Sequence, residues 1–243
     1  PRAHSISGEI PMPSDVPTST LNLAAYVELY FDQPPEGVDA STAAGAGMLT
    51  SGIHDLLHHR DSKGREVMVG ELNARAEEHL VVANDDAVYA AIYRYRRAAL
   101  EGAARVNLRL LARIMIATVL SGDTTPDRYL VYADIIAALT PEEVVLIATM
   151  LRIDRVTQDT GDTIEEQLAS GWHSLKQSMV PNPYPTASSL QAACSRATRS
   201  GLVLPQTAAG IISYHTSPLM DLLEDLASFA EALQYERDNA EGG

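Results

Sequence analysis

The chain has 243 residues, of which 46% are hydrophobic, and its formal net charge at pH 7 is −14. This length and composition allow a large core without disulfides or metals, and no apolar run approaches the ~20 residues that a membrane-spanning helix needs. The acidic charge disfavours nucleic acid and anionic membranes as partners, because both repel a negative surface unless positive charge is locally concentrated.

The first 20 residues predict an extended arm, because four prolines lie among serines and threonines. Such an arm becomes ordered only by lying on its own globular body or on a neighbouring subunit, so it is a candidate for homo-oligomer contacts. A helical domain is expected over residues 21–139. Its predicted parts are a short helix at 21–31, a small-residue segment at 40–57, a helix at 65–82, a long helix at 87–120 weakened or bent at Gly102, and a helix at 127–139.

The clearest local signal is a helix start at Thr140. Threonine is a favoured N-cap, Pro141 suits the first helical position, and Glu143 stands three residues after the cap, as a capping box requires. This helix is predicted to reach about residue 153 and to open a subdomain at 140–235. The elements expected after it are helices at 163–179 and 186–200, strands at 202–204 and 211–214, a helix at 219–235, and a fraying acidic tail at 236–243.

The order of these elements resembles a winged-helix subdomain. Gly201-Leu202-Val203 follows the helix in the recognition-helix position, the two strands make the wing, and Thr216-Ser217-Pro218-Leu219 resembles the turn after many wings, with Met220 in place of glycine. Residues 65–230 also resemble a family of uncharacterised bacterial proteins in which a helical region precedes a winged-helix-like end. The resemblance implies a mostly α fold with one C-terminal β-hairpin, and it carries over no catalytic residue.

Five arginines recur mostly at three- and four-residue steps on the long predicted helix. They are Arg94, Arg97, Arg105, Arg109 and Arg113. Together with Arg96 and Glu101, they give residues 94–113 a charge of +5 inside an acidic chain. A one-faced arginine stripe can bind an acidic partner surface or phosphates, so these five are candidate partner-binding residues. The alternative is a salt-bridged face that meets Asp and Glu side chains of neighbouring helices.

A second constellation suggests a metal site. His54 and His58 would lie one turn apart on a helix, a spacing that can bind zinc, with a third ligand from Glu71, Glu78 or His79. This arrangement would define a metal-dependent hydrolase. The alternative is an ordinary polar helix end beside a charged turn.

A third constellation lies on the predicted recognition helix. Gln191, Arg196 and Arg199 carry side chains that can read base edges in a major groove, although two arginines neutralise few phosphates. Cys194, the only cysteine, is predicted to be a buried structural thiol, and Trp172 is predicted to belong to the core. A chain with one cysteine suits a reducing compartment, so a cytoplasmic location is expected.

The sequence contains no Walker A, G-x-G-x-x-G or G-x-S-x-G motif. We therefore expect no cofactor and favour a protein that is not an enzyme. The predicted function is a non-catalytic protein–protein interaction or assembly protein, binding itself or another protein and no membrane. A nucleic-acid-binding regulator and a metal-dependent hydrolase are the alternatives.

Overall fold

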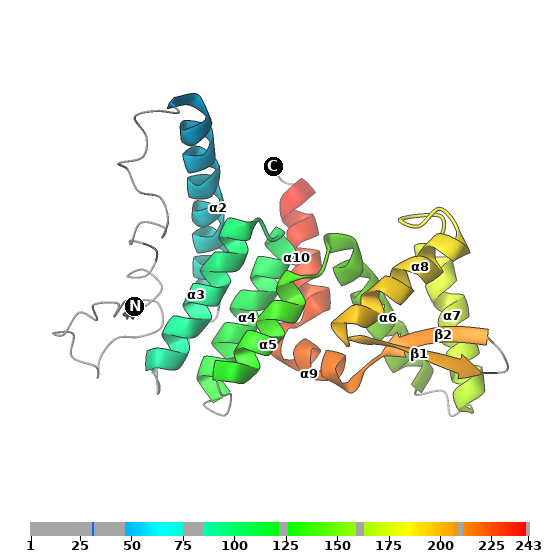
Figure 1. Ribbon diagram of the computed structural model, residues 1–243. Helices are drawn as coiled ribbons and strands as arrows, with labels where there is room; N and C mark the ends of the chain where they lie inside the picture. Colours follow the sequence, from blue (N-terminus) through cyan, green and yellow to red (C-terminus); the bar gives the residue numbers. More distant parts are fainter. Residues whose placement is uncertain are drawn as a thin grey trace, which may run out of the picture.

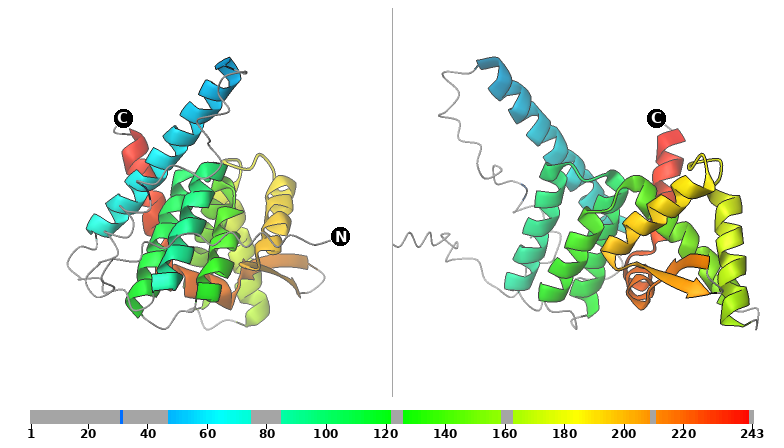
Figure 2. Two further views of the ribbon diagram at one scale, coloured as in Figure 1. Left: turned by 60° about the vertical axis from the view of Figure 1, so that its left-hand side comes forward. Right: turned by 45° about the vertical axis from the view of Figure 1, so that its right-hand side comes forward.

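The computed structural model describes Phe31 and residues 47–74, 85–121, 126–158, 163–208 and 211–241. The first part of the chain forms the helices α2 (Gly47–Ala74), α3 (Asp85–Glu101), α4 (Arg105–Ser121) and α5 (Pro126–Ala137), which pack against one another (Figure 1). The N-terminal turns of α2 project beyond the other helices (Figure 2). The predicted arm at residues 1–20 lies outside the described residues.

The helix α4 lies at the centre of the molecule and contacts α2, α3, α5, α6, α9 and α10. Seven apolar residues of α4 are almost completely inaccessible to solvent, as expected for a helix that other helices surround. They are Leu108, Leu110, Leu111, Ala112, Ile114, Met115 and Ile116. Because α9 and α10 pack on this helix, residues on both sides of the predicted boundary at 139/140 share one core.

The single helix predicted at 87–120 is wrong, because the structure has two helices that separate at Gly102. This glycine adopts a left-handed φ of +94°, and the bonds from Gly102 N to Ala99 O and from Ala103 N to Ala98 O form a Schellman motif. A Cβ at Gly102 would lie 2.9 Å from Nη2 of Arg60. The Arg60 guanidinium also donates to Leu100 O at 2.8 Å, so it covers the end of α3.

The capping box predicted at Thr140 is confirmed. Glu143 N donates to Thr140 Oγ1 at 3.2 Å, and Thr140 N donates to the Glu143 carboxylate at 2.9 Å. This box opens α6 (Pro141–Gln158), and α7 (Ile164–Met179) and α8 (Ala187–Ala197) follow with capping boxes at Thr163 and Thr186.

The two predicted strands are confirmed as an antiparallel hairpin. β1 (Val203–Ala208) pairs with β2 (Ile211–Thr216), with Val203 opposite Thr216 and Ala208 opposite Ile211. The hairpin contacts α6, α7 and α8, and the ring of Trp172 on α7 lies 6.0 Å from that of Tyr214. Across the residues that the structure describes, the fold is therefore mostly α, with one hairpin near the C-terminus, as expected.

The final helix predicted at 219–235 is also two helices, α9 (Pro218–Ala227) and α10 (Phe229–Glu241). The break falls at Ser228, whose left-handed φ of 51° cannot continue a helix. The helix α10 continues to Glu241, so residues 236–241, which were predicted to form the acidic tail, belong to a helix. None of the helices described here combines the length and hydrophobicity needed to cross a bilayer.

Candidate interaction surfaces

All five arginines of the predicted stripe form ion pairs with carboxylates of this chain. Arg94 pairs with Asp134 at 2.7 Å and Arg97 with Glu101 at 2.8 Å, both near the surface. Arg105 pairs with Glu66 at 2.8 Å and, more weakly, with Glu236 at 3.4 Å. The bond from Arg105 is the main cause that lowers the pKa of the exposed Glu66 carboxyl.

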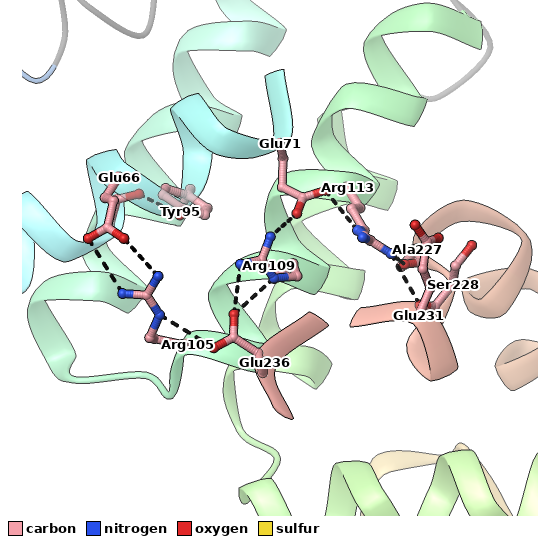
Figure 3. A network of polar contacts seen from close by, with 11 residues as sticks. Glu66, Glu71, Tyr95, Arg105, Arg109, Arg113, Ala227, Ser228, Glu231 and Glu236 are labelled. Carbon is pink, nitrogen blue, oxygen red and sulfur yellow. Dashed lines mark hydrogen bonds and ion pairs between the residues drawn. The ribbon is translucent and has the colours of Figure 1, made fainter. Parts of the chain in front are cut away.

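The centre of this network is Glu71, whose carboxylate lies between two arginines of α4 (Figure 3). Arg109 Nη1 donates to one oxygen of Glu71, and Arg113 Nε donates to the other at 2.8 Å. Arg109 also binds Glu236 at 2.8 Å and lies over the ring of Tyr235, with its Cζ 3.6 Å from the ring centroid. The side chains of Arg109 and Arg113 are only 3% and 5% exposed.

Arg113 also joins the two C-terminal helices to α4. Its Nη1 donates to the carbonyl oxygens of Ala227 and Ser228 at 3.2 and 3.3 Å and lies 3.2 Å from the Glu231 carboxylate. The network therefore connects α2, α4, α9 and α10. A partner on the outer surface cannot reach the guanidinium groups of Arg109 and Arg113, so their placement matches the salt-bridged alternative, not direct partner binding.

The predicted metal ligands do not form a cluster among the residues described. His54 lies within α2, although its side chain is outside the described set, and the exposed His58 lies one turn further along. Both oxygens of nearby Asp61 accept bonds from Arg96, at 2.7 and 2.8 Å. Glu71, a predicted third ligand, is held by Arg109 and Arg113. Across the described ranges, no three His, Cys, Asp or Glu side chains are placed to hold a metal.

The three predicted nucleic-acid-binding residues do not share one environment. Gln191 and Arg196 are exposed on α8. Arg199 lies in the 3₁₀ turn η2 (Thr198–Ser200), where its Nη2 donates to the buried Glu143 carboxylate at 2.8 Å and to Ala138 O at 3.1 Å. Arg199 therefore ties the end of α8 to the start of α6.

The thiol of Cys194 lies where it is a poor nucleophile. Cys194 is completely buried, and this burial raises the pKa of its thiol to about 12. A thiol with such a pKa is a poor nucleophile, because the thiolate is the reactive form. The side chain of Trp172 is partly buried and packs against the core.

Sequence reasoning missed a surface that α6 and α10 form together. Two adjoining cavities of about 460 and 500 Å³ share Thr149, Arg152 and Arg237 in their walls, and we call them the α6–α10 groove. Its other walls come from the end of α7 and the connector to α8. The walls from the two helices include Val145, Thr149, Arg152, Arg155 and Val156 of α6 and Leu233, Gln234 and Arg237 of α10.

Three exposed arginines of this groove lack the ion pairs that the five arginines of the predicted stripe make. Within the described part of the chain, Arg152, Arg155 and Arg237 make no salt bridge or side-chain hydrogen bond. Two carboxylates also line the groove, Glu142 in one cavity and Glu224 in the other. Glu224 already accepts a bond from Phe229 N at 2.7 Å. The shared centre of the groove is therefore cationic.

The groove also has apolar walls. Val145 and Leu233 are partly buried, while Val156 is 65% exposed beside Arg155. One sequence signal could have indicated this surface. Arg152 has no Asp or Glu three or four residues away on its helix, so the sequence offers it no ion pair within that helix. Nothing in the sequence pairs α6 with α10.

Comparisons with protein-family models, curated proteins and solved structures find no match to this chain. We therefore infer function from the geometry and charge of the surfaces above.

Proposed function

We propose that this chain is a non-catalytic, cytoplasmic protein that binds another polypeptide through the α6–α10 groove. The observation that carries the proposal is the set of three arginines, Arg152, Arg155 and Arg237, which line one concave surface without a carboxylate partner in the described chain. Most other arginines of the described helices have a partner within the chain, so the groove gathers three arginines without an ion pair on one surface.

The proposal follows from the chemistry of the groove, in which three exposed guanidinium groups lie beside apolar side chains. In a chain of net charge −14, a cationic groove is surrounded by negative potential, which repels nucleic acid and anionic lipid. Interfaces between proteins combine an apolar centre with arginines and a polar rim, as this groove does. Among the residues described, no three His, Cys, Asp or Glu side chains are placed to hold a metal, and the lone thiol is buried.

The test is site-specific photo-crosslinking in the cells that produce the protein. A photoreactive amino acid replaces Gln234, which is exposed in the groove, and Arg128, which is exposed on α5, serves as the control position. We expect a discrete protein adduct from position 234 and none from position 128. Equal labelling at both positions, or no adduct at position 234, would refute the proposal.

A nucleic-acid-binding regulator is the second candidate, because α8 presents Gln191 and Arg196 to solvent ahead of the hairpin, the order that a winged helix uses. Of the two predicted arginines, Arg199 is bound to Glu143, and only Arg196 makes no ion pair with the described residues. A low-salt binding screen against random duplexes tests this candidate. Binding that disappears in the Arg196→Ala variant would support it, and a blank screen would remove it.

A further inference from the structure

We infer that the α6–α10 groove binds an acidic, amphipathic helix of a partner protein. This inference rests on the function proposed above and adds the chemistry of the bound segment. The charge of the groove selects carboxylates, the apolar walls select leucine-like side chains, and the two flanking helices shape a channel for a third.

The positive charge of the groove comes from arginines on both α6 and α10. Arg152 and Arg155 lie three residues apart on α6, and Arg237 faces the same groove from α10. Arg152 and Arg237 line both cavities, so a bound segment passes between them. Guanidinium groups bind carboxylates through paired N–H donors, and a helix can present carboxylates three or four residues apart to several arginines at once.

The apolar walls distinguish a protein segment from nucleic acid. Val145 and Val156 of α6 and Leu233 of α10 line the groove together with the arginines. A phosphate backbone gains nothing from contact with valine and leucine, whereas the apolar face of an amphipathic helix buries against them.

The length of the groove fits about three helical turns. Val145 and Val156 are 11 residues apart on α6, which corresponds to about 16 Å at 1.5 Å per residue. A helical segment of about 11 residues would therefore contact both cavities. Its acidic residues would face Arg152 and Arg237, while its apolar stripe would contact Val145 and Leu233.

The test is a fluorescence-anisotropy titration of the full chain with a labelled designed peptide. The peptide has about 18 residues, with leucines spaced for one helical face and glutamates beside them. A second peptide has lysine at every glutamate position. The protein variants are Arg152→Glu and Arg237→Glu, with Arg128→Glu on α5 as the matched charge-reversal control. Thermal melting first establishes that all variants are folded.

We expect the acidic peptide to bind the unchanged protein and the Arg128→Glu variant equally, and at least about tenfold more weakly to either groove variant. Binding should also weaken as salt is raised. Equal binding to all variants, equal binding of the lysine peptide, or no saturation at millimolar peptide would overturn the inference. Tighter binding of a duplex oligonucleotide that depends on Arg152 would show that the groove binds nucleic acid. Self-association that is lost in the groove variants would show that it binds a second copy of this chain. Either result would overturn the inference.

The crosslinking experiment separates this inference from the proposed function. If position 234 gives a protein adduct but the acidic peptide does not bind, a protein does use the groove and the inferred chemistry is wrong. If position 234 gives no adduct, the proposed function fails whatever the peptide does.

Discussion

Replacing Glu71 by alanine should damage the fold far more than the same replacement at Glu66. Both residues lie on α2 and pair with arginines of α4, so the effect on helix propensity is nearly the same. Their environments differ, because the Glu71 side chain is 4% exposed and that of Glu66 is 66% exposed. The pair of variants therefore isolates the effect of burial.

The structure sets the expected size of each loss. Removing one member of a buried ion pair costs about 3–5 kcal/mol, because a charge is left without compensation in the interior. After Glu71→Ala, Arg109 keeps Glu236 and Tyr235, and Arg113 keeps its bonds to the break between α9 and α10, so we expect about 3 kcal/mol. An exposed pair contributes about 0–1 kcal/mol, which is the expected loss for Glu66→Ala.

The assay is chemical denaturation followed by circular dichroism, with thermal melting as a second measurement. For a chain of this size, about 3 kcal/mol corresponds to a fall in Tm of roughly 6–12 °C, against at most about 4 °C for the Glu66 variant. Equal losses in the two variants, or a loss below about 1 kcal/mol for Glu71→Ala, would refute the view that Glu71 neutralises two buried arginines.

Three further predictions concern other parts of the molecule. Gly64→Ala should destabilise α2 by about 1–3 kcal/mol, because its Cβ would lie 2.7 Å from that of Ala99, whereas Gly70→Ala, with open space around it, should stabilise by about 0.5–1 kcal/mol; denaturation midpoints test both. Cys194 should react with a thiol reagent at pH 8 only as the protein unfolds, since its pKa of about 12 leaves about a thousandfold less thiolate than the ordinary 9.0; fast labelling of the folded protein would contradict this. Burial raises the pKa of the Asp154 carboxyl, so the protonated carboxyl contributes most to stability and this contribution is lost as pH rises through the folded-state pKa. The stability of Asp154→Asn relative to the unchanged protein should therefore increase from pH 3 toward pH 7. A stability difference that does not change with pH would refute this prediction.

Local features of this fold were predictable because their signals lie within a few residues. The capping box at Thr140 and Glu143 needs only four consecutive residues, and the two strands beside Gly201 are bounded by turn residues. The break at Gly102 was underestimated, because the apolar periodicity continues across it while the left-handed glycine ends the helix.

The surfaces could not be predicted in the same way, because they depend on which helices meet. The partners of Arg109 are Glu71, 38 residues before it, and Glu236, 127 residues after it. Neighbours in sequence also separate, since Glu236 joins the α4 network while Arg237 lines the α6–α10 groove. The spacing of arginines along the chain could be seen in the sequence. Which arginines are buried in ion pairs and which are exposed in the groove is decided by tertiary packing.

The central claim is that the groove arginines are available for binding and do not hold the fold together. The most direct test is the free energy of unfolding of one variant that carries Arg152→Gln, Arg155→Gln and Arg237→Gln. Exposed substitutions without internal partners each change stability by about 0.5 kcal/mol or less, so the triple variant should stay within about 1.5 kcal/mol of the unchanged protein. A loss above about 3 kcal/mol would contradict the claim, because these three side chains would then be supporting the structure instead of offering charge to a partner.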